Sequence, residues 1–188
     1  MRVITGMYKG RTIRTVKDLT VRPATDRVRV TIFNMLEHRM SFSGIRVLDL
    51  FAGSGSLGIE ALSRGAGHAT FVEQHHEAAA YLEENLTLLG CLEQSEIAEM
   101  DAYSYCGVAR SAYDLVFADP PYGYEQTTGL PGVIFGNHLV RAGGYLVMEH
   151  AHDLHFDASA TWDAGPEKKF GRTLVTFFRP KPLGSSPP

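Results

Sequence analysis

The sequence has few of the features that mark a secreted, membrane or zinc-binding protein. Its 188 residues include only two cysteines, Cys91 and Cys106, too few for a disulfide scaffold or a cysteine-based zinc site. No stretch reaches the roughly 18 apolar residues of a membrane span, and the N-terminus lacks the apolar core of a signal peptide. The pair His75-His76 does not have the i, i+4 spacing of zinc ligands. We therefore expect a cytoplasmic protein with reduced thiols, no metal and no membrane partner.

The composition otherwise indicates one ordinary globular domain with a small extension. Hydrophobic residues make up 44% of the chain and charged residues 21%, as in folded proteins of this size. The net charge of −3 hides an asymmetry, because ten of the 18 basic residues and only three of the 21 acidic ones lie within residues 1–46. That segment carries +7 and the remainder −10. A basic arm on an acidic body favours contact with phosphates, and a solvated basic face is the simpler alternative.

A glycine-rich turn follows the most apolar part of the first half. A strand is expected at 45–50 with Asp49 near its end, and the Gly53-x-Gly55-x-x-Gly58 turn that follows opens a helical pattern. Glycines allow a sharp turn and close approach of a ligand, and the helix N-terminus presents free N–H groups. The spacing fits a dinucleotide site, with Glu73 at a suitable distance for a ribose. One interpretation of this turn is therefore that the protein is a dehydrogenase that binds NAD.

A second motif favours S-adenosylmethionine (SAM) over NAD. Asp119-Pro120-Pro121-Tyr122 follows another apolar strand, and this tetrapeptide has no role in a dehydrogenase. Asp49 lies within the strand before the glycines, where its carboxylate could meet the ammonium group of SAM. Asp49 could equally cap the turn by accepting from backbone N–H groups, and both roles are compatible.

The remaining pattern alternates between strand and helix. Two short strands at 2–5 and 11–16 are expected to form a hairpin, and a helix is expected at 26–39 after a loop at 18–24. Further strands are expected at 45–50, 68–73, 96–100, 113–118, 144–149, 167–170 and 173–178, and helices at 54–64, 75–89, 102–110 and 130–141. Residues 150–166 read as irregular. We expect a basic N-terminal extension at 1–43, a main domain at 44–180 and a disordered tail at 181–188.

This alternation predicts an α/β fold with a mainly parallel sheet covered on both faces. Ligands of such sheets bind beyond the C-terminal ends of the strands. Asp49, Gly53, Glu73, Asp101 and Asp119 all fall at or just after expected strand ends. One crevice can therefore collect all five.

Together these motifs resemble one family. The glycine turn with Asp-Pro-Pro-Tyr resembles class I SAM-dependent methyltransferases (Rossmann-like, seven-stranded) that act on an amino or amide nitrogen. Arg2-Val3-Ile4-Thr5-Gly6, the run from Arg22 to Arg29 and the late Lys169-Phe170-Gly171-Arg172-Thr173 are similar to the RsmD family. The resemblance covers about residues 2–179. Thr5 and Val30 depart from the family pattern, which usually has a glycine and an acid there.

The resemblance implies an activity, a cofactor and a partner. RsmD proteins use SAM to methylate the N2 amine of guanine 966 in 16S ribosomal RNA, within the assembling small subunit. The resemblance also implies that the protein is a monomer. The implied cofactor contacts lie at the strand ends: Asp49, Phe51, Gly53, Ser54, Gly55, Glu73, Gln74, Asp101, Ala102 and Asp119. Glu73 would bind the ribose hydroxyls, and Asp101 would accept from the adenine amine.

The same resemblance assigns roles in base binding and RNA contact. Asp119 and the carbonyl of Pro120 would accept the two N–H groups of the guanine amine, Pro121 would hold them rigid, and Tyr122 would stack on an extruded base. The implied RNA contacts are basic residues of the extension: Lys9, Arg11, Arg22, Arg27 and Arg29. The alternatives are a methyltransferase of DNA adenine N6 or protein glutamine, and a non-catalytic SAM-binding ribosome-assembly factor.

Overall fold

A computed structural model of the protein describes residues 1–15 and 26–182. Within these residues seven strands form one sheet in the order β3-β2-β1-β4-β5-β7-β6. The first five strands run parallel, whereas β7 is antiparallel to β5 and β6. Their bounds are β1 Arg46–Leu50, β2 His68–Val72, β3 Ser95–Ala98, β4 Tyr113–Ala118, β5 Val140–Ala151, β6 Trp162–Phe170 and β7 Thr173–Pro180. The predicted mainly parallel α/β sheet is confirmed.

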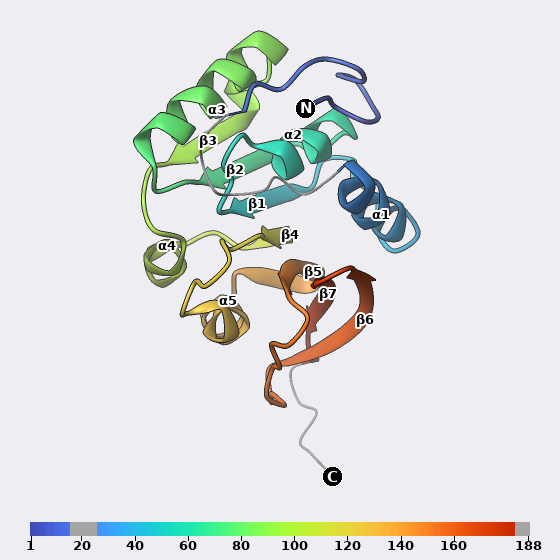
Figure 1. Ribbon diagram of the computed structural model, residues 1–188, viewed down its shortest axis with the longest axis vertical. Helices are drawn as coiled ribbons and strands as arrows, with labels where there is room; N and C mark the ends of the chain where they lie inside the picture. The colour runs from blue at the N-terminus through green and yellow to red at the C-terminus, as the bar shows by residue number, and fades with distance from the viewer. Residues whose placement is uncertain (16–25, 183–188) are drawn as a thin grey trace.

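Helices cover both faces of this sheet, as Figure 1 shows. Helices α1 (Asp26–Glu37), α2 (Ser56–Ser63) and α3 (His76–Leu89) pack on one face. Helices α4 (Ala102–Val108) and α5 (Leu130–Gly136) pack on the other. Two short 3₁₀ helices, η1 (Leu92–Gln94) and η2 (Thr127–Gly129), precede β3 and α5. The molecule is therefore a three-layer α/β/α arrangement.

Apolar residues on both sides of each central strand explain the layers. In β1, the buried Val47 belongs to the core under α1, α2 and α3, while its neighbour Leu48 belongs to the core under α4 and α5. Phe117 and Val116 of β4 divide in the same way. Successive side chains of a strand point to opposite faces, so a strand buried on both faces is a continuous apolar run.

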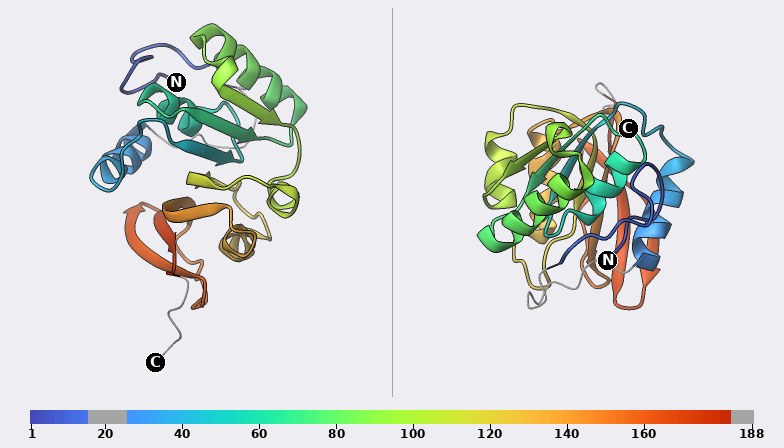
Figure 2. Two further views of the ribbon diagram at one scale, coloured as in Figure 1. Left: turned by 180° about the vertical axis from the view of Figure 1, so that it is seen from behind. Right: turned by 90° about the horizontal axis from the view of Figure 1, so that it is seen from above.

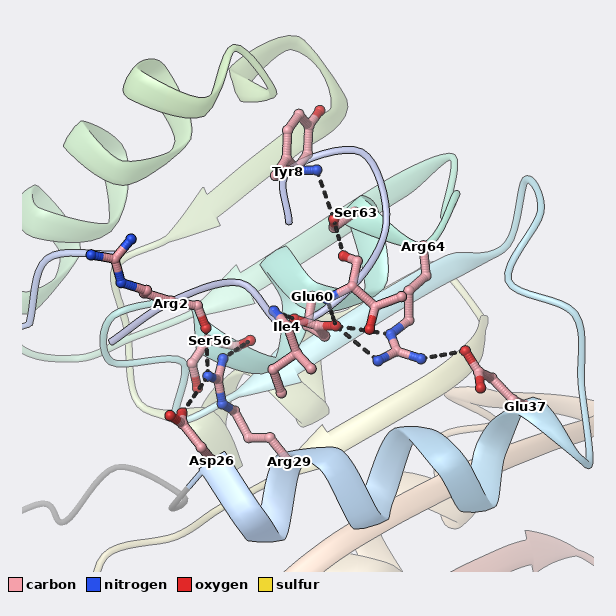
Figure 3. Close-up of polar contacts among 11 residues, drawn as sticks. Arg2, Ile4, Tyr8, Asp26, Arg29, Glu37, Ser56, Glu60, Ser63 and Arg64 are labelled. Carbon is pink, nitrogen blue, oxygen red and sulfur yellow. Dashed lines mark hydrogen bonds and ion pairs between the residues drawn. The ribbon is translucent and has the colours of Figure 1, made fainter. Parts of the chain in front are cut away.

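The N-terminal segment is fixed to α2 by buried polar contacts, shown in Figure 3. The Glu60 carboxylate, which is fully buried, accepts from the backbone N–H groups of Ile4 at 2.7 Å and Thr5 at 3.0 Å. Arg64 neutralises the same carboxylate at 2.9 Å. Gly6 has a φ of +83°, and a Cβ there would lie 1.8 Å from the Ser63 carbonyl oxygen. The chain can therefore approach α2 this closely only with glycine at position 6.

The described part of the extension shares the core of the sheet domain. Val3 and Ile13 of the N-terminal segment, and Phe33 of α1, are buried in the same cluster as Phe117 of β4. Figure 2 shows the N-terminal segment over α2, at the far side of the molecule from β6 and β7. Within residues 1–15, the expected hairpin strands are reduced to one antiparallel bridge, Arg2 with Thr12. The expected loop at 18–24 and most of the tail lie outside the described residues.

The C-terminal third differs most from the predicted elements. The helix expected at 130–141 ends at Gly136, and β5 begins at Val140 and continues to Ala151. An irregularity in the β4–β5 pairing explains the error, because Tyr113 pairs with Val140 but Leu115 pairs with Tyr145. Residues 162–166 were expected to be irregular and instead belong to β6. These segments become strands through pairing with distant partners, which local sequence does not report.

None of the described helices is long and apolar enough to cross a bilayer. Across residues 1–15 and 26–182, no group of three or more His, Cys, Asp or Glu side chains is placed to hold a metal ion.

Candidate active site

The turn between β1 and α2 has an unusual backbone. Phe51, Gly53 and Gly55 all have positive φ, at 62°, 53° and 80°. A Cβ on Gly55 would lie 2.4 Å from Leu82, and one on Gly58 would lie 2.3 Å from Phe71, so these two glycines allow α2 to pack closely. A Cβ on Gly53 would meet nothing within 4 Å. The turn is therefore tight on the core side and open at Gly53, as close approach of a ligand requires.

Two buried carboxylates hold this turn from beneath. Asp49 accepts from the backbone N–H of Gly58 at 2.8 Å. Glu73 accepts from Gly53 N–H at 2.9 Å and from His75 N–H at 2.8 Å. Burial raises the pKa of Asp49 to about 7; the bond from Gly58 opposes this rise and the nearby charge of Glu73 adds to it. The capping role considered for Asp49 is thus present, and Glu73 is a buried residue of the site.

A third acid lies at the end of β3. Asp101 caps α4 by accepting from Ser104 N–H at 2.8 Å, and its other oxygen accepts from the Tyr124 hydroxyl at 3.2 Å. Burial raises the pKa of Asp101, but the bonds from Ser104 and Tyr124 outweigh it and lower the pKa overall. Tyr124 also packs edge-on against Phe51, with ring centroids 5.1 Å apart. Asp101 is thereby joined to the glycine turn.

The other expected cofactor residues flank these groups. The Ser54 carbonyl oxygen accepts from Asn85 of α3 at 3.1 Å. Ala102 is buried at the start of α4. Gln74 is exposed, with its Nε2 atom 3.4 Å from Nε2 of His75. All of them lie at the C-terminal edge of the parallel strands.

A cavity of about 720 Å³ opens beside this edge. It is lined by the whole of the Asp119-Pro120-Pro121-Tyr122 motif, by Arg27 and Val28 of α1, and by the Glu149–Ala151 end of β5. The size is typical of sites for small ligands. Tyr122 is 71% exposed and its hydroxyl lies 2.7 Å from Oγ1 of Thr173. The tetrapeptide therefore presents an acid and an aromatic ring to one cavity.

Asp119 lies next to a second acid that the sequence analysis left without a role. Ala118, the last residue of β4, pairs with Met148 of β5, so Asp119 just after β4 lies beside Glu149, which is still within β5. Burial raises the pKa of Asp119 well above its usual value, and the charges of Glu149 and Asp49 raise it further. Like charges this close favour retention of one proton. The position of Glu149 at a strand end was the available signal.

The cations expected to bind RNA lie in separate places. Arg27 lines the cavity. Lys9 is exposed beside the end of α2, and Arg11 donates to the carbonyl of Leu88 near the end of α3. Both residues therefore lie away from the cavity, at the opposite edge of the sheet. Arg22 lies outside the described residues. Two exposed cations that had no assigned role also line the cavity: Lys169 near the end of β6 and Arg172 in the β6–β7 turn.

Arg29 requires a correction. Its side chain is fully buried and donates to the carbonyl of Arg2 and the carboxylate of Asp26, both at 2.7 Å, as Figure 3 shows. A further contact reaches the Ser56 carbonyl at 3.5 Å. This guanidinium ties α1 to the N-terminal segment and to the start of α2. It is not available to an RNA phosphate in this structure.

These features fit a SAM-type cofactor and define the class. The turn is open at Gly53, where a Cβ would meet nothing, and acids stand at the ends of β1, β2 and β3, with Asp-Pro-Pro-Tyr at the end of β4. The fold is that of the class I SAM-dependent methyltransferases, and SAM is the cofactor of this class.

Similarity to known proteins identifies the family within this class. The family described as "Conserved hypothetical protein 95" matches residues 1–179. "Ribosomal RNA small subunit methyltransferase D" of Escherichia coli K12 is 37% identical, over 99% of this chain and 93% of that one. Its namesake from Haemophilus influenzae is 32% identical, over 91% and 89%. The solved structure of E. coli yhhF is 28% identical, with a TM-score of 0.85 over 97% and 99% of the two chains. The chain belongs to this family, the RsmD family.

Proposed function

We propose that this protein methylates the exocyclic N2 amine of one guanine in 16S ribosomal RNA, the position equivalent to guanine 966, in the small subunit or its assembly intermediate. The observation that carries the proposal is the Asp119-Pro120-Pro121-Tyr122 motif, which lines a cavity of about 720 Å³. The motif follows Ala118 of β4, which pairs with Leu50 of β1 just before the glycine turn. Two relatives that cover most of the chain are named ribosomal RNA small subunit methyltransferase D. Their names support ribosomal RNA as the substrate.

In this proposal the open glycine turn and the strand-end acids hold SAM. Asp49 accepts from its ammonium group, and Glu73 binds the ribose hydroxyls while keeping its bonds to Gly53 and His75. Asp101 accepts from the adenine amine, and Phe51 and Tyr124 supply apolar surface beside it. SAM supplies a methyl group that is activated by the positive charge of its sulfonium.

Asp119 and Pro120 prepare the guanine amine. That amine is a weak nucleophile, because its lone pair is delocalised into the ring. The Asp119 carboxylate and the Pro120 carbonyl accept its two N–H groups and so direct the lone pair away from them, towards the methyl donor. The raised pKa of Asp119 suits it to take the proton that N2 must lose. Tyr122 stacks on the base, and Pro121 limits the freedom of the backbone between them.

Positive charge at the cavity holds the RNA backbone near the target base. Arg27 lines the cavity from α1, and Lys169 and Arg172 line it from the β6–β7 hairpin. Contacts by Lys9 and Arg11 at the opposite edge of the sheet would require an RNA surface that wraps around the protein. Phosphate contacts of this kind position the RNA without reading its sequence.

The test is methyl transfer from labelled SAM to small subunits that lack the modification, followed by mass mapping of the labelled nucleotide. Label on N2 of a single guanine supports the proposal. Label only on DNA adenine or on protein glutamine would instead select one of the other amino-group methyltransferases. Retention of SAM without transfer to any of these substrates would point to a non-catalytic assembly factor, and Asp119→Asn provides the inactive control for the assay.

A further inference from the structure

The cavity is lined by two carboxylates, whereas the proposed methyl transfer to an amine uses only one of them. Besides Asp119, it is lined by Glu149, and the β4–β5 register sets the two side by side. Side chains two positions apart in a strand share a face. Glu149 therefore lies on the face of Val147, which belongs to the core under α1, α2 and α3. Asp119, the residue after β4, lines the same cavity as Glu149. Both carboxylates are thus presented to the cavity that Arg27 and Val28 of α1 also line.

Two adjacent carboxylates match the hydrogen-bonding edge of guanine. Guanine presents N2–H and N1–H as neighbouring donors, whereas adenine presents an amine beside an unprotonated N1, which is an acceptor. A carboxylate opposite N1 would attract guanine and repel adenine. An acceptor left without a donor in a closed site costs affinity, and such mismatches separate similar substrates strongly.

We propose that Glu149 is a specificity-determining residue that accepts the N1–H of the target guanine while Asp119 accepts from the N2 amine. This inference rests on the proposed function and extends it to the choice of base. The electrostatics agree, because Glu149 and Asp119 already interact in the free protein, and a ligand with two donors relieves their repulsion. The other titratable and charged groups that line the cavity are Arg27 of α1, His150 of β5, Lys169 of β6 and Arg172 of the β6–β7 turn. Burial lowers the pKa of His150 and favours its neutral form, and Asp49 of β1 acts on Asp119 through its charge.

The test changes two groups in combination: the Glu149 carboxylate of the protein and the N1–H donor of the target base. Small subunits are assembled with 16S RNA that carries either guanine or 2-aminopurine at the target position. 2-Aminopurine keeps the N2 amine but has an unprotonated N1. We expect the wild-type protein to prefer guanine by about 10- to 100-fold in kcat/KM. In Glu149→Gln the carboxamide can donate to N1, so this preference should fall at least about tenfold.

The comparison isolates the N1 contact. 2-Aminopurine also lacks the guanine O6 atom, but that loss is common to both protein variants and cancels in the cycle. Glu96→Gln makes the same chemical change on β3, outside the cavity lining, and should leave the preference unchanged. Glu149→Asp retains the charge and should keep the preference for guanine at reduced turnover, which provides a second variant if Glu149→Gln folds poorly.

A structural role for Glu149 predicts a different result. In that case Glu149→Gln would lower kcat/KM equally for both bases, and an unchanged ratio would overturn the inference while leaving the proposed function intact. A wild-type protein that labels no guanine N2 would refute the proposed function itself, and this inference with it. Binding of S-adenosylhomocysteine (SAH) and thermal unfolding of each variant show whether the fold is retained.

Discussion

Asp49→Asn should make the protein more stable at alkaline pH, because Asp49 is an ionisable group with 2% exposure in the folded state. Its pKa is raised from 3.8 to about 7, and a difference of about 3 units corresponds to about 4 kcal/mol at 1.36 kcal/mol per unit. The folded state binds the proton more tightly than the unfolded state. This group's contribution to stability is therefore fully present below pH 4 and is lost as pH rises to 7.

Asparagine removes that loss while keeping an acceptor for Gly58 N–H. We expect the free energy of unfolding of Asp49→Asn, minus that of the wild type, to increase by roughly 2 kcal/mol or more between pH 5 and pH 8. Urea unfolding of both proteins at each pH measures this difference, and the titrating groups that do not interact with Asp49 cancel. Asp119 does interact with it, and loss of the Asp49 charge lowers the pKa of Asp119, which changes the difference in the same direction. Asp157→Asn, at an exposed position, is the matched control and should show no such trend.

A difference that stays flat between pH 5 and pH 8 would refute the argument, since it would mean that Asp49 is ionised at low cost. The proposed cofactor role adds a second readout. Asp49→Asn should weaken SAH binding, because a neutral amide replaces the carboxylate that faces the ammonium group. Greater stability with poorer binding would identify Asp49 as a residue kept for function at the expense of stability.

Three further substitutions test other parts of the molecule. Asp119→Ala should abolish methyl transfer yet leave SAH binding, measured by calorimetry, nearly intact; undiminished turnover would contradict the role given to Asp119. Gly58→Ala should lower the free energy of unfolding by about 1–3 kcal/mol, because its Cβ would lie 2.3 Å from Phe71, and urea unfolding would detect this. Glu60→Ala should cost about 3–5 kcal/mol by leaving Arg64 and two backbone N–H groups without their buried partner. Amide exchange in residues 1–15 should rise with it, and unchanged protection there would argue against this contact.

Local sequence determined the elements whose signals are strong. The strand at 113–118 was predicted at its observed bounds, and Gly90 ends α3 as expected, in a left-handed conformation. The motifs at Gly53 and Asp119 follow strands because an apolar run ends there. Topology then requires them to share one edge of the sheet. The family resemblance added the activity, which composition and periodicity alone do not determine.

Tertiary structure decided the features that depend on distant partners. The family resemblance implies that Arg29 contacts RNA, but its guanidinium is buried and donates to the Arg2 carbonyl and to Asp26. Residues 162–166 become a strand because β7 supplies their backbone partners. Glu149 acquires its place beside Asp119 only through the β4–β5 register. Sequence patterns report a residue's own conformational preference and polarity, whereas contacts between residues far apart in the chain arise only when the sheet assembles.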